Sequence, residues 1–460
     1  MPFLRKLWAS GLAACLASGL WAEGPARAIE VAILHPRPPA SDTDRALRGP
    51  VLDADDLAAL ALARSPRLKA AAAFQQARGE RAVQERSWMD PVLSYALAPQ
   101  SLSSEMRTGW SLRLEQSIPF PGRTSLRGRA AELEAAAAGG DRRALELAIA
   151  AEAYELYADY YGLAREAELL EKQGELLRAL QASALARHQA GKASRGPALM
   201  AEVELHHTHH GMLKIAGRQA EVLARMDALL DRRGGANLPQ LPPPVAELPL
   251  LSGAENEDEA VKEALRSRPE IAALRARRGA ALTRVDLARR ERFPDLMFMA
   301  EQSTFMEEAD LRFALGVSVA LPLRFARRSA MVRESNDEAQ LLHYELAAAE
   351  AAITGEVRRA LADLHSACDV AANYATNILP TARDWLDSAR LDYEAGRAEL
   401  REVIEAARHL HEAEFGRHEA LAGQVLARAR LDAARGRMPG RATTVPVPLD
   451  STPSPESDHE

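Results

Sequence analysis

The chain alternates between two hydrophobic patterns. Over 110–118 and again over 311–321, large or apolar side chains occupy every second position and polar or small ones lie between them. This period is typical of β-strands, and the length suits a tilted strand that crosses a bilayer. From Leu145 to Leu170, apolar residues instead recur every three or four positions, as in a coiled coil. We therefore predict strands that lead into very long helices, the first of them over 123–189.

The prolines indicate that this plan occurs twice. Three pairs of prolines share a separation of 203 residues: Pro66 and Pro269, Pro91 and Pro294, and Pro119 and Pro322. This register predicts a tandem duplication, with repeats at 55–235 and 257–437. Each repeat is expected to hold a first helix (55–87 or 257–291), a strand pair (91–120 or 294–322) and a long helical hairpin. The hairpins are expected to turn at Gly191 and Gly396, and their returning helices to cover 197–233 and 399–435.

Proline and glycine explain how strand gives way to helix. Proline has no N–H for a sheet and fixes φ, so Pro119 and Pro322 are predicted to end the second strand of each pair. Pro121 and Gly122 then complete the turn into the first long helix. Outside the repeats, 236–256 is predicted to be a proline-rich linker and 438–460 a disordered tail.

The N-terminus is predicted to be a secretory signal peptide over 1–28, followed by an extended segment over 29–54. A basic start precedes a short apolar run, and Ala28 ends a small-x-small cleavage site. A second processing site competes with it, because Cys15 has the spacing of a bacterial lipoprotein signal and would then be lipidated. The sequence leaves both alternatives open.

Composition and charge narrow the function classes. Aromatic residues make up 5% of the chain and its formal net charge is −7, which favours long helices packed through small side chains and argues against a nucleic-acid partner. No motif of a nucleophilic, phosphate-binding or zinc-dependent enzyme occurs, so we expect neither enzymatic activity nor a cofactor. His206 and His210 are four residues apart and could share a metal, although an exposed polar helix face is the commoner explanation.

Four strands cannot close a barrel in lipid, so closure requires several chains. The segments QSIPFPGR (116–123) and YEAG (393–396), together with the duplication, resemble the TolC-type outer-membrane efflux family. The resemblance implies an α+β membrane protein in which three chains form a 12-stranded outer-membrane β-barrel and a periplasmic α-barrel of long helical hairpins. It also implies a homotrimer in outer-membrane lipid that works with a periplasmic adaptor and an inner-membrane pump of the resistance-nodulation-division type. One branch of the family exports heavy metals.

The resemblance also implies a gate beside the glycine turns. Tyr393, Glu402 and Glu405 correspond to the tyrosine and the paired acids of that region, and acids three residues apart share a helix face. Ala398 occupies a position where related ducts can carry arginine, so the closed state is expected to differ. A solvated charged face is the alternative.

The predicted function is that of an outer-membrane duct in a tripartite efflux system. The alternatives are a periplasmic helical adaptor, or an outer-membrane-anchored coiled-coil scaffold without transport. An adaptor would have many more β segments, and a scaffold would lack the strand pairs. The exported substrate is not encoded in any recognisable motif, because the pump selects most of the cargo.

Overall fold

The structure is a computed structural model that describes residues 50–98, 109–232, 241–253, 255–304, 312–321 and 323–440. The predicted signal peptide, Cys15, the segment 29–49, Pro322 and the tail from 441 onward lie outside the described residues.

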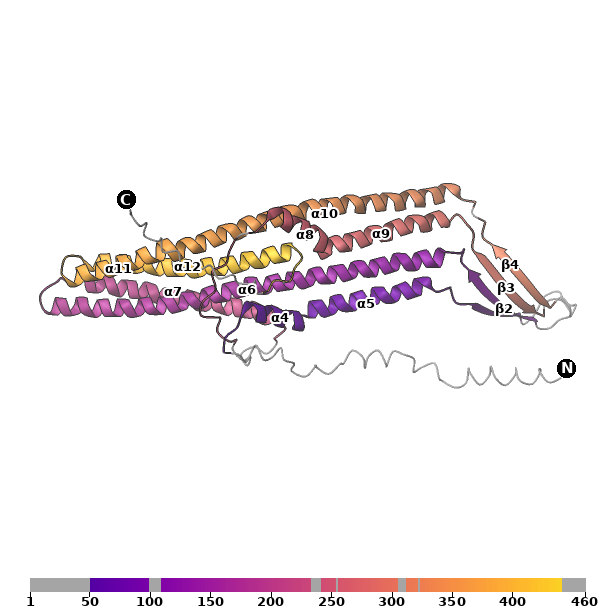
Figure 1. Ribbon diagram of the computed structural model, residues 1–460. Coiled ribbons are helices and arrows are strands. Elements are labelled where there is room, and N and C mark those ends of the chain that lie inside the picture. The colour runs from indigo at the N-terminus through magenta and orange to yellow at the C-terminus, as the bar shows by residue number, and fades with distance from the viewer. Residues whose placement is uncertain are drawn as a thin grey trace, which may run out of the picture. The chain divides into compact units, whose positions relative to one another are not determined.

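The described chain is mostly helical, and its two halves present their elements in the same order (Figure 1). The first half contains α4 (Ala54–Arg64), α5 (Pro66–Arg86), β1 (Val92–Ala98), β2 (Gly109–Ile118), α6 (Arg123–Gln189) and α7 (Gly196–Leu229). The second half contains α8 (Glu257–Ser267), α9 (Pro269–Arg290), β3 (Leu296–Ser303), β4 (Phe313–Val319), α10 (Phe325–Asn373), the π-helix η3 (Tyr374–Ile378), α11 (Leu379–Glu394) and α12 (Leu400–Ala434). The predicted strand pairs and long helical hairpins therefore have counterparts in the structure.

The first helix of each half was predicted to be continuous, and that prediction was wrong. The predicted 55–87 is two helices that meet at Ser65, and the predicted 257–291 is two helices that meet at Arg268. Pro66 and Pro269 begin the second helix of each pair, and the α region is disfavoured for a residue before proline. Ser65 and Arg268 accordingly have ψ values of 118° and 123°.

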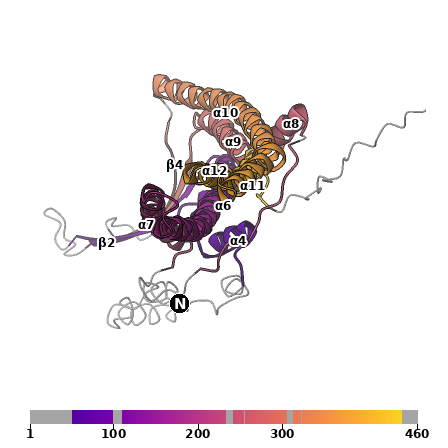
Figure 2. The same cartoon turned by 90° about the vertical axis from the view of Figure 1, so that its left-hand side faces the viewer.

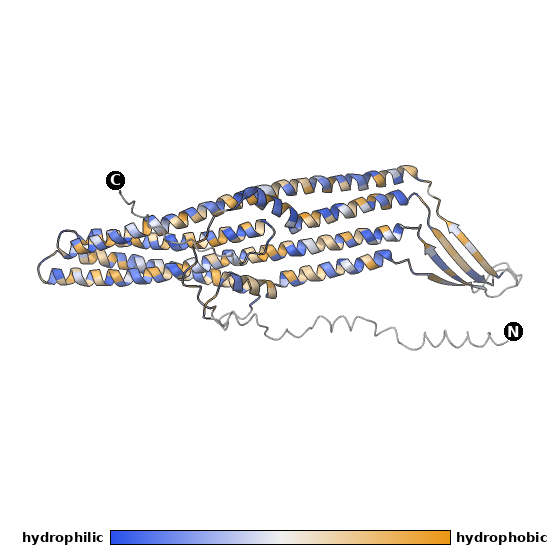
Figure 3. Cartoon of the chain, viewed as in Figure 1, coloured by the Kyte–Doolittle hydropathy of each residue, from blue (hydrophilic) through white to orange (hydrophobic). Residues whose placement is uncertain are grey.

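Helix α6 is the element around which the others pack. Its 67 residues correspond to about 100 Å of helix. It packs against α5, α7, α9 and α12, and α9 in turn packs against α10 (Figure 2). Hydrophobic and hydrophilic residues alternate at short intervals along the long helices (Figure 3). Small residues allow close approach: a Cβ on Gly140 would lie 2.9 Å from the carbonyl oxygen of Pro269.

Tyrosines on α6 hold the segments that cross it. Tyr157 donates a hydrogen bond to the carbonyl of Leu52 at 3.1 Å, and Tyr160 donates to the carbonyl of Pro242 at 3.0 Å. Pro242 belongs to the linker between the two halves. The linker is therefore tied to the middle of the helical part through buried or half-buried hydroxyl groups.

The four strands form one antiparallel sheet in the order β1-β2-β3-β4. Leu93 is paired with Leu114, Leu114 with Ala300, and Ala300 with Leu315. The central pair, β2 with β3, joins the two halves of the chain. Among the described residues, no helix combines the length and the apolarity needed to cross a lipid bilayer.

Candidate channel wall and helical tips

The sheet has one strongly apolar face. Because the strands pair in register, the alternate residues of all four strands gather on this face. Leu315 is 76% exposed there, Tyr95 63% and Phe313 61%. The face is lined by Leu93, Tyr95, Leu97, Trp110, Leu112, Leu114, Ile118, Leu296, Phe298, Ala300, Phe313, Leu315, Val317 and Val319, with Gln116 and Gln302 as its polar members. An exposed apolar surface of this extent marks a site that contacts a membrane or another protein.

The opposite face of the sheet is largely polar or small. It carries Ser94, Ser111, Glu115, Ser117, Ala314, Gly316 and Ser318, and its larger apolar members are Val92, Met297 and Met299. Arg113 on β2 forms an ion pair with Glu301 on β3, with 2.9 Å between Nη2 and the carboxylate oxygen. The sheet therefore separates an apolar surface from a surface suited to water.

Both edges of the sheet lack a second neighbour within the described chain. β1 pairs with β2 alone and β4 pairs with β3 alone among the described strands. In hydrocarbon, each unpaired backbone group costs several kcal/mol. In a membrane, the backbone hydrogen bonds of β1 and β4 would therefore be satisfied only if both edge strands paired with further strands.

A buried arginine fixes the strand-to-helix junction. Arg123, the first residue of α6, is 6% exposed and forms an ion pair with Asp295 at 2.6 Å. Its guanidinium also donates to the carbonyls of Arg290 and Phe293, at 3.2 and 2.5 Å. Phe120 stacks on Phe293 with 4.6 Å between ring centroids. The junction that holds Pro119, Pro121 and Gly122 is thus attached to the second half of the chain.

The two glycine turns have closely similar backbone geometry. Gly191 and Gly396 have φ values of +70° and +76°. The N–H of Gly191 donates to His188 at 2.9 Å, and that of Gly396 donates to Tyr393 at 3.1 Å. Left-handed φ angles of this kind end helices and favour glycine. These two residues therefore lie where α6 turns into α7 and where α11 turns into α12.

The two helical tips are joined by an arginine and a tyrosine. Arg187 on α6 lies over the ring of Tyr393, 4.1 Å from its centroid, and donates to the Tyr393 carbonyl at 3.1 Å. Tyr393 is 8% exposed and packs with Leu400, Val403 and Ile404 in the cluster that unites the two hairpins. Sequence reasoning missed Arg187, although it precedes Gly191 by about the same interval as Tyr393 precedes Gly396.

The candidate gate residues do not share one surface in the single chain. Glu402 and Glu405 are exposed, whereas Val403, Ile404, Ala406 and Ala407 on the other side of α12 are buried. Tyr393 is turned into the core of its own chain. The structure therefore brings the two carboxylates to one exposed face and keeps the tyrosine ring away from it.

The histidine cluster on α7 is exposed. His206 and His210 both lie on the surface, as do His207 and His209. Within the described residues, no group of three or more potential metal ligands is brought together.

Comparisons with known proteins follow this geometry. Residues 260–437 match the model of a family described as outer membrane efflux protein. A membrane protein from Pseudomonas aeruginosa has a TM-score of 0.72 at 18% identity, over 89% of this chain and 98% of that one. The outer membrane protein VceC from Vibrio cholerae has a TM-score of 0.69 at 18% identity, over 84% and 96%. CusC, whose structures concern transmembrane channel formation, has a TM-score of 0.71 at 18% identity, over 85% and 94%. The search of curated proteins returned no match.

The fold is that of the outer-membrane channels, and the family match covers the second half of the chain. The second half of the chain matches the outer membrane efflux protein family, so the resemblance found in the sequence is confirmed. The location of the chain is the bacterial outer membrane, with the helical part in the periplasm.

Proposed function

We propose that this chain is the outer-membrane duct of a tripartite efflux system. Three copies would form a closed barrel in the outer membrane and a helical tunnel in the periplasm. A periplasmic adaptor would connect the tunnel to an inner-membrane pump of the resistance-nodulation-division type, and the pump would select the cargo. The two halves, 55–235 and 257–437, would be the repeats of an ancestral duplication.

The main support for this proposal is the sheet, which has one apolar and one largely polar face and whose edge strands have unpaired backbone groups. Its apolar face suits lipid and its polar face suits a water-filled lumen. Pairing β4 of one chain with β1 of the next would satisfy both edges at once. Three chains with four strands each give twelve strands, an even number that a closed antiparallel barrel requires.

Two neighbouring positions on β4 provide the test. Leu315 lies on the apolar face and is 76% exposed, while Ala314 lies on the opposite face beside Glu301. A lysine on the lipid face of a barrel costs about 2–4 kcal/mol near the bilayer midplane. Leu315→Lys is therefore expected to reduce the amount of assembled trimer in the outer membrane, measured by membrane fractionation and native electrophoresis.

Ala314→Lys is the matched control. It adds the same charge one residue away, on the face expected to meet water, where Glu301 can pair with it. Assembly of this variant is expected to equal that of the wild type. Equal assembly of both variants would contradict the barrel and favour the scaffold alternative, with a lipid anchor at Cys15.

The acids beside the second glycine turn are proposed to form the narrow end of the duct. Glu402 and Glu405 lie on the exposed face of α12, on the side opposite its buried residues. Three copies of this face, turned toward a common axis, would place six carboxylates around the passage. Tyr393 would support this face from within the chain.

A further inference from the structure

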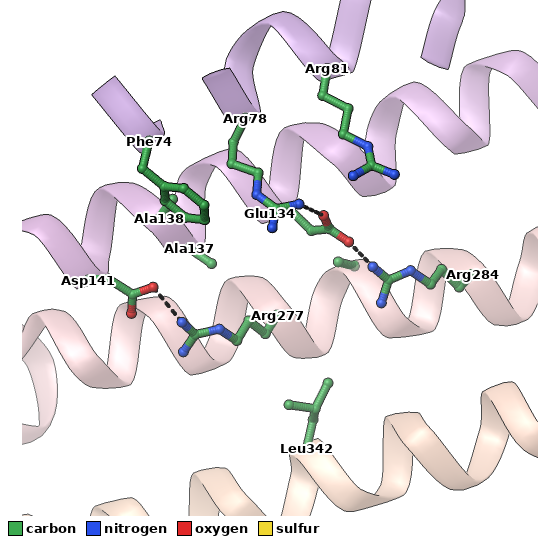
Figure 4. Close-up of a pocket in the computed structure, with 11 residues that line it drawn as sticks. Phe74, Arg78, Arg81, Glu134, Ala137, Ala138, Asp141, Arg277, Arg284 and Leu342 are labelled. Carbon is green, nitrogen blue, oxygen red and sulfur yellow. Dashed lines mark hydrogen bonds and ion pairs between the residues drawn. The ribbon is translucent and has the colours of Figure 1, made fainter. Parts of the chain in front are cut away.

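A cavity in the helical wall brings four guanidinium groups together (Figure 4). Its volume is about 510 Å³, and α5, α6, α9 and α10 all contribute to its lining. None of the roles assigned above uses it. The volume lies in the range of sites that bind small organic molecules.

Positive charge exceeds negative charge in this cavity. Arg78 and Arg81 come from α5, Arg277 and Arg284 from α9, and the two lining carboxylates, Glu134 and Asp141, from α6. These four cations face two lining anions, and Glu85 adds a third carboxylate beside Arg81.

Glu134 serves two arginines at once. It accepts from Arg78 at 3.4 Å and also pairs with Arg284. Arg277 donates to Asp141 at 2.5 Å. Arg81 pairs with Glu85 of its own helix at 3.6 Å, and its side chain is 57% exposed. The guanidinium groups of Arg81 and Arg284 therefore keep donors available for a further anion.

The cavity also offers an apolar surface beside the arginines. Ala137, Ala138 and Ala280 are nearly fully buried and keep the floor free of larger side chains. Phe74 is 52% exposed, and the guanidinium of Arg78 lies 4.9 Å from its ring centroid. A planar apolar group on the ligand can stack in this region.

The cavity begins about 9 Å from the strand end of α9, since Arg284 precedes Arg290 by six residues, and it extends away from the strands. Asp141 follows Arg123, where α6 leaves the strand, by 18 residues, which corresponds to about 27 Å of helix. Glu134 is about 16 Å from the same point. The cavity therefore belongs to the periplasmic part of the helices.

We propose that this cavity binds a periplasmic organic dianion, with a phosphate group held by Arg81 and Arg284 and a planar apolar part beside Phe74 and Leu342. Phosphate geometry matches the forked donors of arginine. The two groups together account for both the excess charge and the apolar surface.

Binding of 1-naphthyl phosphate to the purified full-length protein in detergent tests this assignment by isothermal titration calorimetry. At about pH 7.5 the phosphate is mostly dianionic. The wild type is expected to bind 1-naphthyl phosphate about tenfold or more tightly than either inorganic phosphate or 1-naphthol. Inorganic phosphate lacks the planar apolar group, and 1-naphthol lacks the phosphate. The double variant Arg81→Gln, Arg284→Gln is expected to lose affinity by about tenfold or more.

The matched control removes one arginine from each of the same two helices outside the cavity. Arg67 on α5 and Arg289 on α9 are 60% and 57% exposed, and the double variant Arg67→Gln, Arg289→Gln should bind as the wild type does. If the cavity double variant unfolds early, Arg81→Gln alone replaces it. The proposal is overturned by absent binding, by equal losses in both variants, or by inorganic phosphate binding as tightly as the naphthyl ester.

Discussion

His418 is a titratable side chain inside the helical part of the molecule. Its Nδ1 lies 2.8 Å from the hydroxyl of Tyr161 in a hydrogen bond. Burial lowers the pKa of His418 to about 4, and the guanidinium groups of Arg417 and Arg165 act in the same direction, while Glu247 opposes them. The folded protein therefore keeps this ring neutral at pH values where an unfolded histidine, with a pKa near about 6.5, takes up a proton.

Acid should consequently weaken the fold through His418. As pH falls from about 6.5 to about 4, the unfolded state binds a proton that the folded state does not bind, which lowers the free energy of unfolding. Above about pH 7 the contribution is fully present. His418→Asn keeps a hydrogen-bonding partner for Tyr161 but does not titrate. In thermal melts, its melting temperature should fall less than that of the wild type between these pH values.

An identical acid dependence in His418→Asn and the wild type would show that other groups dominate. Glu255 is one such group, since Arg435 and Arg428 lower its pKa despite burial, and its contribution is lost as pH falls. The difference between the two proteins isolates His418 because Glu255 is present in both.

Single residues of the candidate site were predictable from the sequence to different degrees. The spacing of Glu402 and Glu405 requires a shared helix face, and the structure has both exposed. The environment of Tyr393 was not predictable, because Arg187, which covers its ring, is 206 residues away. Arg123 and Asp295 are likewise separated by 172 residues. Local patterns contain no information about such contacts until the fold is known.

Some helix boundaries are also set by local sequence, whereas others depend on tertiary packing. The bounds of α6 agree with the sequence prediction, because Gly122 and Gly191 set its ends locally. The breaks at Ser65 and Arg268 were missed, although Pro66 and Pro269 were recognised as marks of duplication. Proline at the first position of a helix is compatible with a single bent helix or with two helices, and tertiary packing decides between them.

Two glycines of the second hairpin are expected to respond oppositely to a methyl group. Gly396 has a φ of +76°, where alanine is strained by about 1–2 kcal/mol. Gly423 lies within α12, where alanine is favoured over glycine by about 0.5–1 kcal/mol. A Cβ at either position would meet no atom within 4 Å in the chain. Gly396→Ala should therefore lower the melting temperature and Gly423→Ala should raise it.

Each substitution is the control for the other, since both add one methyl group to open space at the same hairpin. Shifts of the melting temperature in the same direction would contradict the assignment of Gly396 as a conformationally required turn residue.

The described part of the molecule has two features that the single chain leaves without a partner element. The sheet edges at β1 and β4 lack further neighbours among the described strands, and Glu402 and Glu405 on α12 are exposed. Sequence alone indicated the first feature, because four strands are too few to close a barrel. Both features would gain partners in the same proposed threefold assembly.

The proposed threefold assembly makes a prediction about conduction. If Glu402 and Glu405 of three chains surround one passage, six carboxylates attract cations there and disfavour anions. The double variant Glu402→Gln, Glu405→Gln should then lower the cation preference in single-channel recordings by about half or more. Block by multivalent cations should weaken as well. Trimer stability should change little, because both side chains are exposed.

Asp384 and Asp387 on α11 provide the matched control. They are also exposed, also three residues apart, and lie at a comparable distance in sequence from Gly396. Asp384→Asn, Asp387→Asn removes the same charge from the other helix of this tip, and it should leave selectivity closer to that of the wild type. Unchanged selectivity and block in a folded Glu402→Gln, Glu405→Gln trimer would exclude these acids from the pore. Defective efflux in cells together with unchanged conduction would instead place them on the surface that meets the adaptor.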